Sequence, residues 1–146
     1  MLEASMLAGM AISNARTTAA HAISYPMTVF FRVPHEIACG IVLTPLIRYN
    51  SGAMDSVKEQ VLLENLGFKT MNELAHVVEC LNERIKLPVC LRDLGIRQAN
   101  LATIVSNGAR PDRINNNPRE ITPSDIKNML EEILEWIELG PLCHLP

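Results

Sequence analysis

The sequence of 146 residues has few aromatic side chains, which make up 4% of the chain, although 48% of its residues are hydrophobic. Strands are enriched in aromatic and β-branched residues, so a core built mainly from Ala, Leu, Ile, Val and Met favours helices packed on helices. A chain of this length buries a sizeable core in one domain. The composition therefore predicts an all-α fold, a helical bundle that forms a single domain over residues 1–146.

The chain also lacks an excess of positive charge, because its formal net charge is -3 and its sequence pI is about 5.8. Binding to a nucleic-acid backbone or to an anionic membrane surface requires a positively charged surface. The apolar run at residues 7–12 is far too short to cross a bilayer, and no basic segment precedes it. We therefore expect neither nucleic acid nor a membrane as a partner.

Closely spaced cysteines are missing as well. The four cysteines are far apart and form no Cys-x-x-Cys pair. A chain of this size does not need disulfides for stability, so the spacing predicts reduced thiols and a cytoplasmic protein. The neighbours Cys143 and His144 lie at the chain end, where disorder is the expectation rather than a metal-binding pair.

Two histidines carry the first chemical signal. His21 falls one turn inside a helix that Thr17 or Thr18 is expected to cap, and His35 follows a Val-Pro break and begins the next helix. Imidazole is a ligand for zinc and for ferrous iron, and a turn that folds the chain back would bring the two rings together. Two ligands do not fill a metal site, and each histidine has an ordinary alternative, as a hydrogen-bonded core residue or as a helix start.

The remaining helices follow from local patterns. Residues 2–15 are rich in Ala, Met and Leu and predict a buried helix, and residues 36–49 are apolar almost all round, as in a helix surrounded by others. Pro26 is expected to kink or end the helix that holds His21, because proline lacks the amide donor. A helix over residues 55–66 should end at Gly67, and a capping box from Thr70 to Glu73 begins another.

Further along the chain, residues 98–106 predict a short helix and residues 108–118 a surface loop with many helix breakers. Thr122 followed by Pro123 begins a last helix, whose apolar stripe runs from Ile126 to Ile137 and stops before Gly140.

Several segments in a fixed order resemble the iron-containing (group III) alcohol dehydrogenases. The first four are Met-Leu-Ala-Gly-Met-Ala-Ile-Ser-Asn at 6–14, Ala-His at 20–21, Val-Pro-His at 33–35 and the run at 43–50. Leu-Arg-Asp-Leu-Gly at 91–95 and Asn-Pro-Arg-Glu-Ile-Thr at 117–122 extend the similarity to about residue 134. The run at 16–28 resembles a branch that includes phosphonoacetaldehyde reductases. The resemblance implies the C-terminal helical domain of such an enzyme.

That resemblance also implies roles for residues. His21 and His35 would be the last two of four protein ligands to a catalytic divalent metal, iron or sometimes zinc. The other two ligands, an Asp and a His, and the domain that binds NAD or NADP have no counterpart here, because the sequence holds neither Asp-x-x-x-His nor a glycine-rich phosphate loop. We therefore expect a truncated fragment that binds no nicotinamide cofactor and is inactive alone. Its parent would act on a small alcohol or aldehyde, with an anionic aldehyde suggested by the branch.

The sequence departs from the family pattern beside both histidines. Glu36 follows His35 where the family usually has glycine, and Tyr25 stands where many members carry a histidine one turn after the first ligand seen here. Tyr25 is the candidate catalytic residue, a possible proton relay, with simple packing as its alternative. Arg16 and Thr17 are candidate substrate-binding residues, and Arg16 has a solvated surface position as its alternative.

Two classes of function remain open at this point. The chain is either part of a metal-dependent dehydrogenase or a self-standing helical interaction module that has kept the family sequence without its chemistry. The residues encoded upstream would discriminate between them. In both cases apolar surface around the first helices should be exposed, so we expect self-association through residues 2–47.

Overall fold

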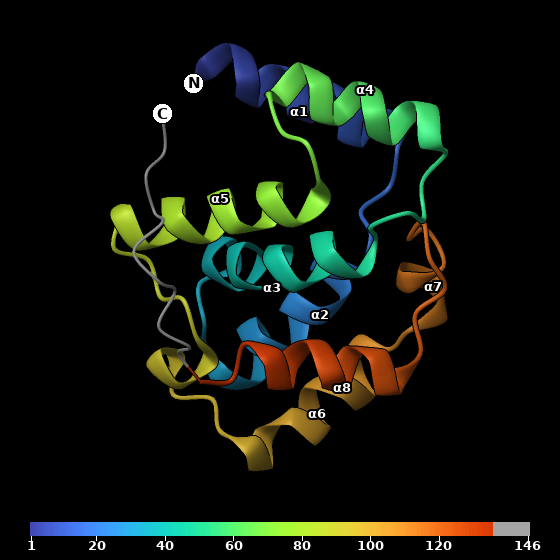
Figure 1. The fold of residues 1–146 in the computed structure, drawn as a ribbon. Coiled ribbons are helices and arrows are strands. Elements are labelled where there is room, and N and C mark those ends of the chain that lie inside the picture. Colours follow the sequence, from blue (N-terminus) through green and yellow to red (C-terminus); the bar gives the residue numbers. More distant parts are fainter. Residues whose placement is uncertain (136–146) are drawn as a thin grey trace.

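The computed structural model describes residues 1–135, and all regular elements in that range are helical (Figure 1). The elements are α1 (Leu2–Asn14), α2 (Ala19–Phe31), α3 (His35–Tyr49), α4 (Ser56–Leu66), α5 (Met71–Arg84), the 3-10 helix η1 (Leu91–Leu94), α6 (Gln98–Gly108), α7 (Pro111–Ile114) and α8 (Pro123–Glu132). The predicted all-α class is confirmed. None of the described helices has the length and hydropathy that a bilayer span requires.

Threonine side chains cap two of these helices at the predicted positions. In α5 the Glu73 amide donates to Thr70 Oγ1 at 3.1 Å, and the Glu73 carboxylate accepts from the Lys69 amide at 2.7 Å. In α8 the Thr122 hydroxyl accepts from the Asp125 amide, and the Asp125 carboxylate accepts from the Thr122 amide at 2.8 Å. These bonds satisfy amides that a helix start otherwise leaves unpaired.

Helix α2 lies at the centre of the bundle, where it contacts α3, α6 and α7, and α3 in turn contacts α5 and α8 (Figure 1). The fully buried side chains at their interfaces are apolar and come from α2, α3, α6, α8 and the segment around η1. Those with no exposed surface are Ala19, Ile23, Met27, Ala38, Leu91, Ile96, Ile104, Ile126 and Leu130. The core therefore surrounds α2, the helix that carries His21.

The first helix forms as predicted, but the prediction that it is buried is wrong. No residue of α1 is buried, and four of its apolar side chains are 56–59% exposed: Met6, Leu7, Met10 and Ile12. Figure 1 shows α1 and α4 at one end of the molecule and α6 at the other. Helix α4 also exposes apolar side chains, among them Val57 and Val61. The apolar composition predicted the helix correctly, but it did not reveal that no other described element buries the apolar side chains of α1.

Several local details also differ from the sequence predictions. Pro26 does not end α2, which continues to Phe31, and Thr18 stands at the N-cap of α2 without a side-chain capping bond. The predicted loop at 108–118 contains the single turn α7. Helix α8 ends at Glu132, before Ile133 and Leu134 of its predicted stripe. Ile137, Gly140 and the pair Cys143–His144 lie outside the described residues.

The cysteines are not all reduced. Cys39 and Cys90 are free thiols. Cys80 is disulfide-bonded, so the prediction of reduced thiols throughout the chain is wrong at this position.

Candidate metal centre

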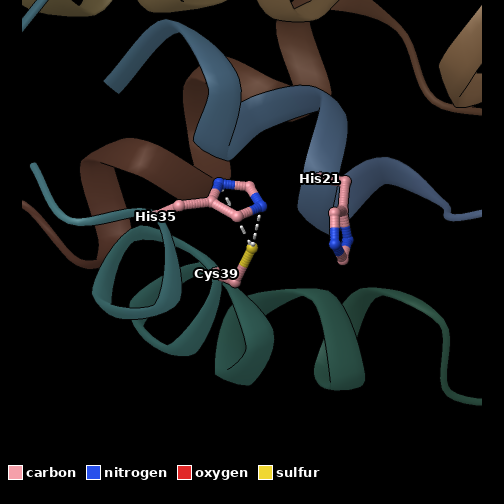
Figure 2. Close-up of side chains that lie close together, drawn as sticks. All are labelled: His21, His35 and Cys39. Atoms are coloured by element: carbon pink, nitrogen blue, oxygen red, sulfur yellow. Dashed lines mark hydrogen bonds between the residues drawn. The ribbon is translucent and has the colours of Figure 1, made fainter. Parts of the chain in front are cut away.

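His21 and His35 meet between α2 and α3 (Figure 2). Their ring centroids are 5.2 Å apart and the ring planes are inclined by 67°. His21 projects from the first turns of α2 and His35 is the first residue of α3. Two imidazoles from adjacent helices are thus brought within reach of one ion, as the spacing of the two histidines suggested.

The turn between α2 and α3 makes this meeting possible. Arg32 has a positive φ of 57°, and its amide donates to Thr28 O while the Val33 amide donates to Met27 O at 3.3 Å. These bonds close α2 and reverse the chain direction. Pro34, with φ of -52° and ψ of 133°, is then the N-cap of α3. Only three residues separate the helices, so α3 starts beside α2.

A third potential ligand, Cys39, joins the two histidines. Its Sγ lies 3.6 Å from His35 Nε2, one helical turn away on α3. Cys39 donates to Ser24 Oγ at 3.2 Å, and the Ser24 hydroxyl donates to the carbonyl of His21 at 3.1 Å. One ligand atom from each of His21, His35 and Cys39 lies within 4.8 Å of the others. Cys39 was not among the site residues predicted from the sequence, although the spacing His-x-x-x-Cys on a helix places both side chains on one face.

The surroundings of His21 favour its neutral form. Burial lowers the pKa of His21 from its usual value of 6.5, and the neighbouring His35 lowers that pKa further. A neutral imidazole keeps a nitrogen lone pair available, and metal ligation requires this form. The three side chains are half-buried, so the group is partly shielded from water yet open to an ion.

The other candidate site residues lie at different distances from this group. Tyr25 packs beside His35, with ring centroids 5.2 Å apart and planes inclined by 35°, and it is 43% exposed. Arg16 and Thr17 precede α2 by a few residues. Arg16 is exposed, and its backbone carbonyl accepts from Asn116 Nδ2 at 2.9 Å. The structure thus brings Tyr25 to the histidine pair and anchors the backbone at Arg16.

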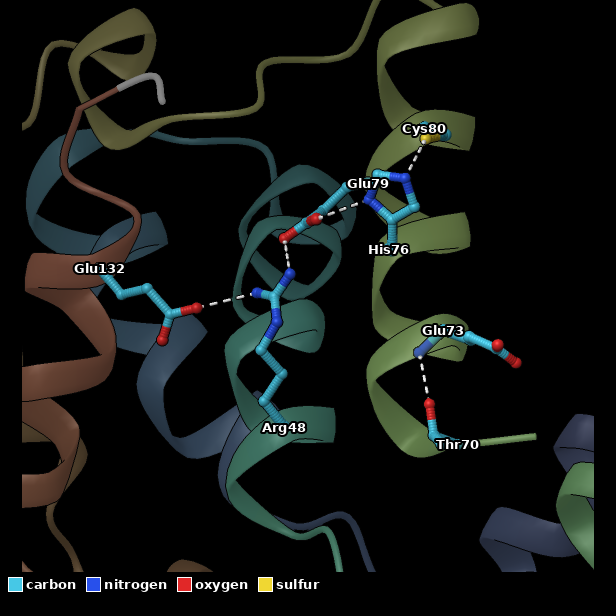
Figure 3. Close-up of polar contacts among 7 residues, drawn as sticks. All are labelled: Arg48, Thr70, Glu73, His76, Glu79, Cys80 and Glu132. Atoms are coloured by element: carbon cyan, nitrogen blue, oxygen red, sulfur yellow. Dashed lines mark hydrogen bonds and ion pairs between the residues drawn. The ribbon is translucent and has the colours of Figure 1, made fainter. Parts of the chain in front are cut away.

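An ion-pair network fixes α3, the helix of His35 and Cys39, between its neighbours (Figure 3). Arg48 Nη2 lies 2.6 Å from Glu79 Oε1 on α5, and Arg48 Nη1 lies 2.8 Å from Glu132 Oε1 on α8. His76 Nδ1 lies 3.7 Å from Glu79 Oε2. One guanidinium therefore joins three helices.

The sequence of the chain matches a known protein family. The profile of the Fe-containing alcohol dehydrogenase family, C-terminal, matches residues 1–134. The chain belongs to this family. It is 31% identical to 1-propanol dehydrogenase from Salmonella typhimurium over 147 residues, which covers 92% of this chain and 40% of that protein.

A solved structure and a local match agree with this assignment. The structure of the chain is similar to that of sulfoacetaldehyde reductase from Bifidobacterium kashiwanohense, which was solved in complex with NAD+. The two match with a TM-score of 0.72 and 32% sequence identity, over 80% of this chain and 31% of that one. Phosphonoacetaldehyde reductase from Streptomyces viridochromogenes is 50% identical over 42 residues, 29% of this chain and 11% of that protein. This local similarity agrees with the resemblance noted in the sequence.

The chain spans about a third of the length of the curated relatives it matches, for example 33% of lactaldehyde reductase from Escherichia coli. Their complete activities therefore concern proteins about three times as long. The described residues correspond to the C-terminal, helical part of the family.

Proposed function

We propose that this chain supplies His21 and His35 to the metal centre of an NAD(P)-linked alcohol dehydrogenase or aldehyde reductase. The observation that carries the proposal is the convergence of these two imidazoles, with ring centroids 5.2 Å apart, inside a family match that covers residues 1–134. Nitrogen donors of this kind suit iron or zinc. When bound, such a divalent ion supplies Lewis acidity that polarises the carbon–oxygen bond of the substrate.

The chain's own residues would position the ion and the substrate. His21 and His35 hold the ion from two helices whose mutual placement is fixed by the three-residue turn. Tyr25, beside His35 and 43% exposed, is placed to contact a substrate or to relay a proton at its phenol oxygen. Arg16 and Thr17, just before α2, are proposed to bind the substrate.

We propose a small alcohol or aldehyde as the substrate, and an anionic aldehyde in particular. Two of the similar proteins are named for reduction of phosphonoacetaldehyde and of sulfoacetaldehyde, both of which carry an anionic group. The guanidinium of Arg16 would complement such a charge. The predicted cytoplasmic location stays a prediction.

The complete reaction needs parts that this sequence does not contain. It has no glycine-rich phosphate loop and no Asp-x-x-x-His segment. Other residues of the full-length parent would therefore bind the nicotinamide cofactor and supply two more metal ligands. We propose that residues 1–146 form one helical domain of that parent. We expect negligible oxidation of NADH or NADPH with any aldehyde by the 146-residue chain, and measurable turnover would contradict this.

Metal binding tests the proposed centre directly. The purified chain would be titrated with Zn²⁺, and His21→Ala and His35→Ala should each lower the affinity at least about tenfold, since even the loss of an outer-shell partner costs about 10–100-fold. His76→Ala is the matched control, because His76 lies on α5 beside Glu79 and should leave the affinity unchanged. Affinities that are equal in all four proteins would refute the centre.

A second candidate function is a helical interaction module that associates with itself. The observation in its favour is α1, which has no buried residue and exposes large apolar side chains, among them Met6, Leu7, Met10 and Ile12. Apolar surface of this kind usually marks a contact with another protein surface. A second copy of the chain is the proposed occupant, and sedimentation velocity over a range of concentrations tests it.

A further inference from the structure

We propose that Cys39 is a third protein ligand, so that this chain forms a His2Cys metal site selective for Zn²⁺. The inference deepens the proposed function, because it concerns the same centre. The sulfur comes from α3, one turn after His35, and the third donor, His21, comes from α2 (Figure 2). Within residues 1–135 this is the one group of three side chains with such convergent donor atoms.

The separation of His35 and Cys39 already matches shared coordination of one ion. With bond lengths of about 2.0–2.1 Å from zinc to nitrogen and about 2.3 Å from zinc to sulfur, tetrahedral geometry sets the N···S separation near about 3.6 Å. The distance from Cys39 Sγ to His35 Nε2 is 3.6 Å. Cys39 Sγ is also 4.0 Å from His35 Nδ1, so the His35 ring must turn to aim its Nε2 lone pair at an ion that the sulfur shares, while the backbone spacing on α3 already fits.

His21 needs only a small adjustment to complete the group. The three donor atoms lie within 4.8 Å of one another, whereas two nitrogen ligands of one tetrahedral zinc are about 3.3 Å apart. A side-chain rotation of His21 covers this difference. Ser24 orients the Cys39 thiol, because its hydroxyl accepts from that thiol and is itself fixed on α2 by donating to the backbone carbonyl of His21.

A histidine and a cysteine four residues apart also occur on α5, as His76 and Cys80, but they do not form such a site. Cys80 Sγ lies 3.6 Å from His76 Nε2, the same separation as in the proposed site (Figure 3). Cys80, however, is disulfide-bonded, whereas Cys39 is a free thiol. The pair on α3 also has a third donor on the facing helix, so it alone presents a free sulfur and two imidazoles together.

The donor set favours zinc over hard cations. Thiolate and imidazole together suit zinc, while carboxylate and water ligands suit magnesium, calcium or manganese. On binding, the Cys39 thiol releases its proton to solvent as the metal–sulfur bond forms, and no oxidant or reductant takes part. In the 146-residue chain these three protein ligands leave at least one zinc position for a ligand from elsewhere, such as water or a residue of the full-length parent.

Cobalt substitution tests the sulfur ligand without reference to activity. The 146-residue chain titrated with Co²⁺ should show near-ultraviolet sulfur-to-cobalt charge-transfer absorption. Cys39→Ser should abolish this absorption and lower the affinity for Zn²⁺ at least about tenfold, since it removes a direct ligand. Cys90→Ser is the matched control, because Cys90 is also a free thiol but is buried in the core. Thermal unfolding would confirm that both variants are folded.

The outcomes separate this inference from the proposed function. Charge-transfer absorption that is lost in Cys39→Ser and kept in Cys90→Ser supports the sulfur ligand. If Co²⁺ binding depends on His21 and His35 but the absorption is absent, or survives in Cys39→Ser, the third ligand is refuted and the two-histidine centre stands. If binding depends on neither histidine, the centre itself fails.

Discussion

Replacing Arg48 with Met should destabilise the protein by about 2 kcal/mol, because the guanidinium is the hydrogen-bond partner of a largely buried carboxylate. Arg48 Nη2 lies 2.6 Å from Glu79 Oε1, and the side chains of Arg48 and Glu79 are 29% and 16% exposed. The other oxygen, Glu79 Oε2, is buried without a hydrogen bond. Removing Arg48 would therefore leave Glu79 with only the longer contact to His76, whose Nδ1 lies 3.7 Å from Oε2.

The magnitude follows from two limits. Breaking a fully buried ion pair costs about 3–5 kcal/mol, and a hydrogen bond to a charged group contributes about 1.5–3 kcal/mol. Since both side chains keep some exposure, the lower range applies. The pair of Arg48 with Glu132 should contribute only about 0.2–1 kcal/mol, because Glu132 is 43% exposed and its charge is screened by water.

A double-mutant cycle separates the two pairs. Urea unfolding of Arg48→Met, Glu79→Gln, Glu132→Gln and the two double variants gives the coupling free energies. Glu79→Gln should recover most of the loss caused by Arg48→Met, since it removes the unpaired charge. A coupling to Glu132 equal to or larger than the coupling to Glu79, or a cost of Arg48→Met below about 0.5 kcal/mol, would refute this reasoning.

Three further predictions concern the cap of α8, the histidine neighbour and the exposed helix. Thr122→Ala should cost about 1 kcal/mol at neutral pH in urea unfolding. Hydrogen bonds from the Thr122 side chain and amide hold the pKa of Asp125 below its usual 3.8. The carboxylate therefore stabilises the fold above that pH, and this stabilisation is lost as the pH falls through the lower folded pKa. Asp125→Asn should equal the wild type in stability only at such low pH, and a difference in stability that does not change with pH would contradict this. Tyr25→Phe keeps the ring beside His35 and should change Zn²⁺ affinity less than about twofold, whereas Tyr25→Ala should lower it more, and an equal loss in both would assign the effect to the hydroxyl. The wild-type chain should associate as concentration rises in sedimentation velocity and the variant Leu7→Glu/Met10→Glu should not, while a strictly monomeric wild type would argue against an interface on α1.

The helices whose start depends on adjacent residues were predictable from sequence. Thr70 and Thr122 each accept from an amide three residues further on, so the capping signal and its effect lie within one turn. The end of α4 at Gly67 is equally local, since the residue has a positive φ of 78°. The exposure of α1 was not predictable in this way. Apolar residues show that a helix could be buried, but whether it is buried depends on whether another part of the protein packs against it.

The candidate site shows the same division. His21 and His35 stood out because a proline break and a helix pattern flank them in the sequence. Cys39 did not stand out, because a cysteine in an apolar helix has the same pattern as a core residue. Its spacing from His35 was visible, but its approach to Ser24 depends on how α3 crosses α2. Contacts between segments therefore decided what the local pattern left open.

Pro26 illustrates how such contacts also preserve a helix that local rules would interrupt. Proline removes the donor that the carbonyl of Ala22 would accept from within α2. Helix α6 packs directly on this point, where a Cβ added to Gly108 would lie 3.3 Å from Ala22 O and 3.4 Å from Ile23 Cα. The absence of a side chain at Gly108 lets the two backbones approach, and Ile23 on the same stretch is fully buried. Ala22 is the residue next to His21, so the close approach of α6 at Gly108, 87 residues further along the chain, supports α2 beside the first imidazole.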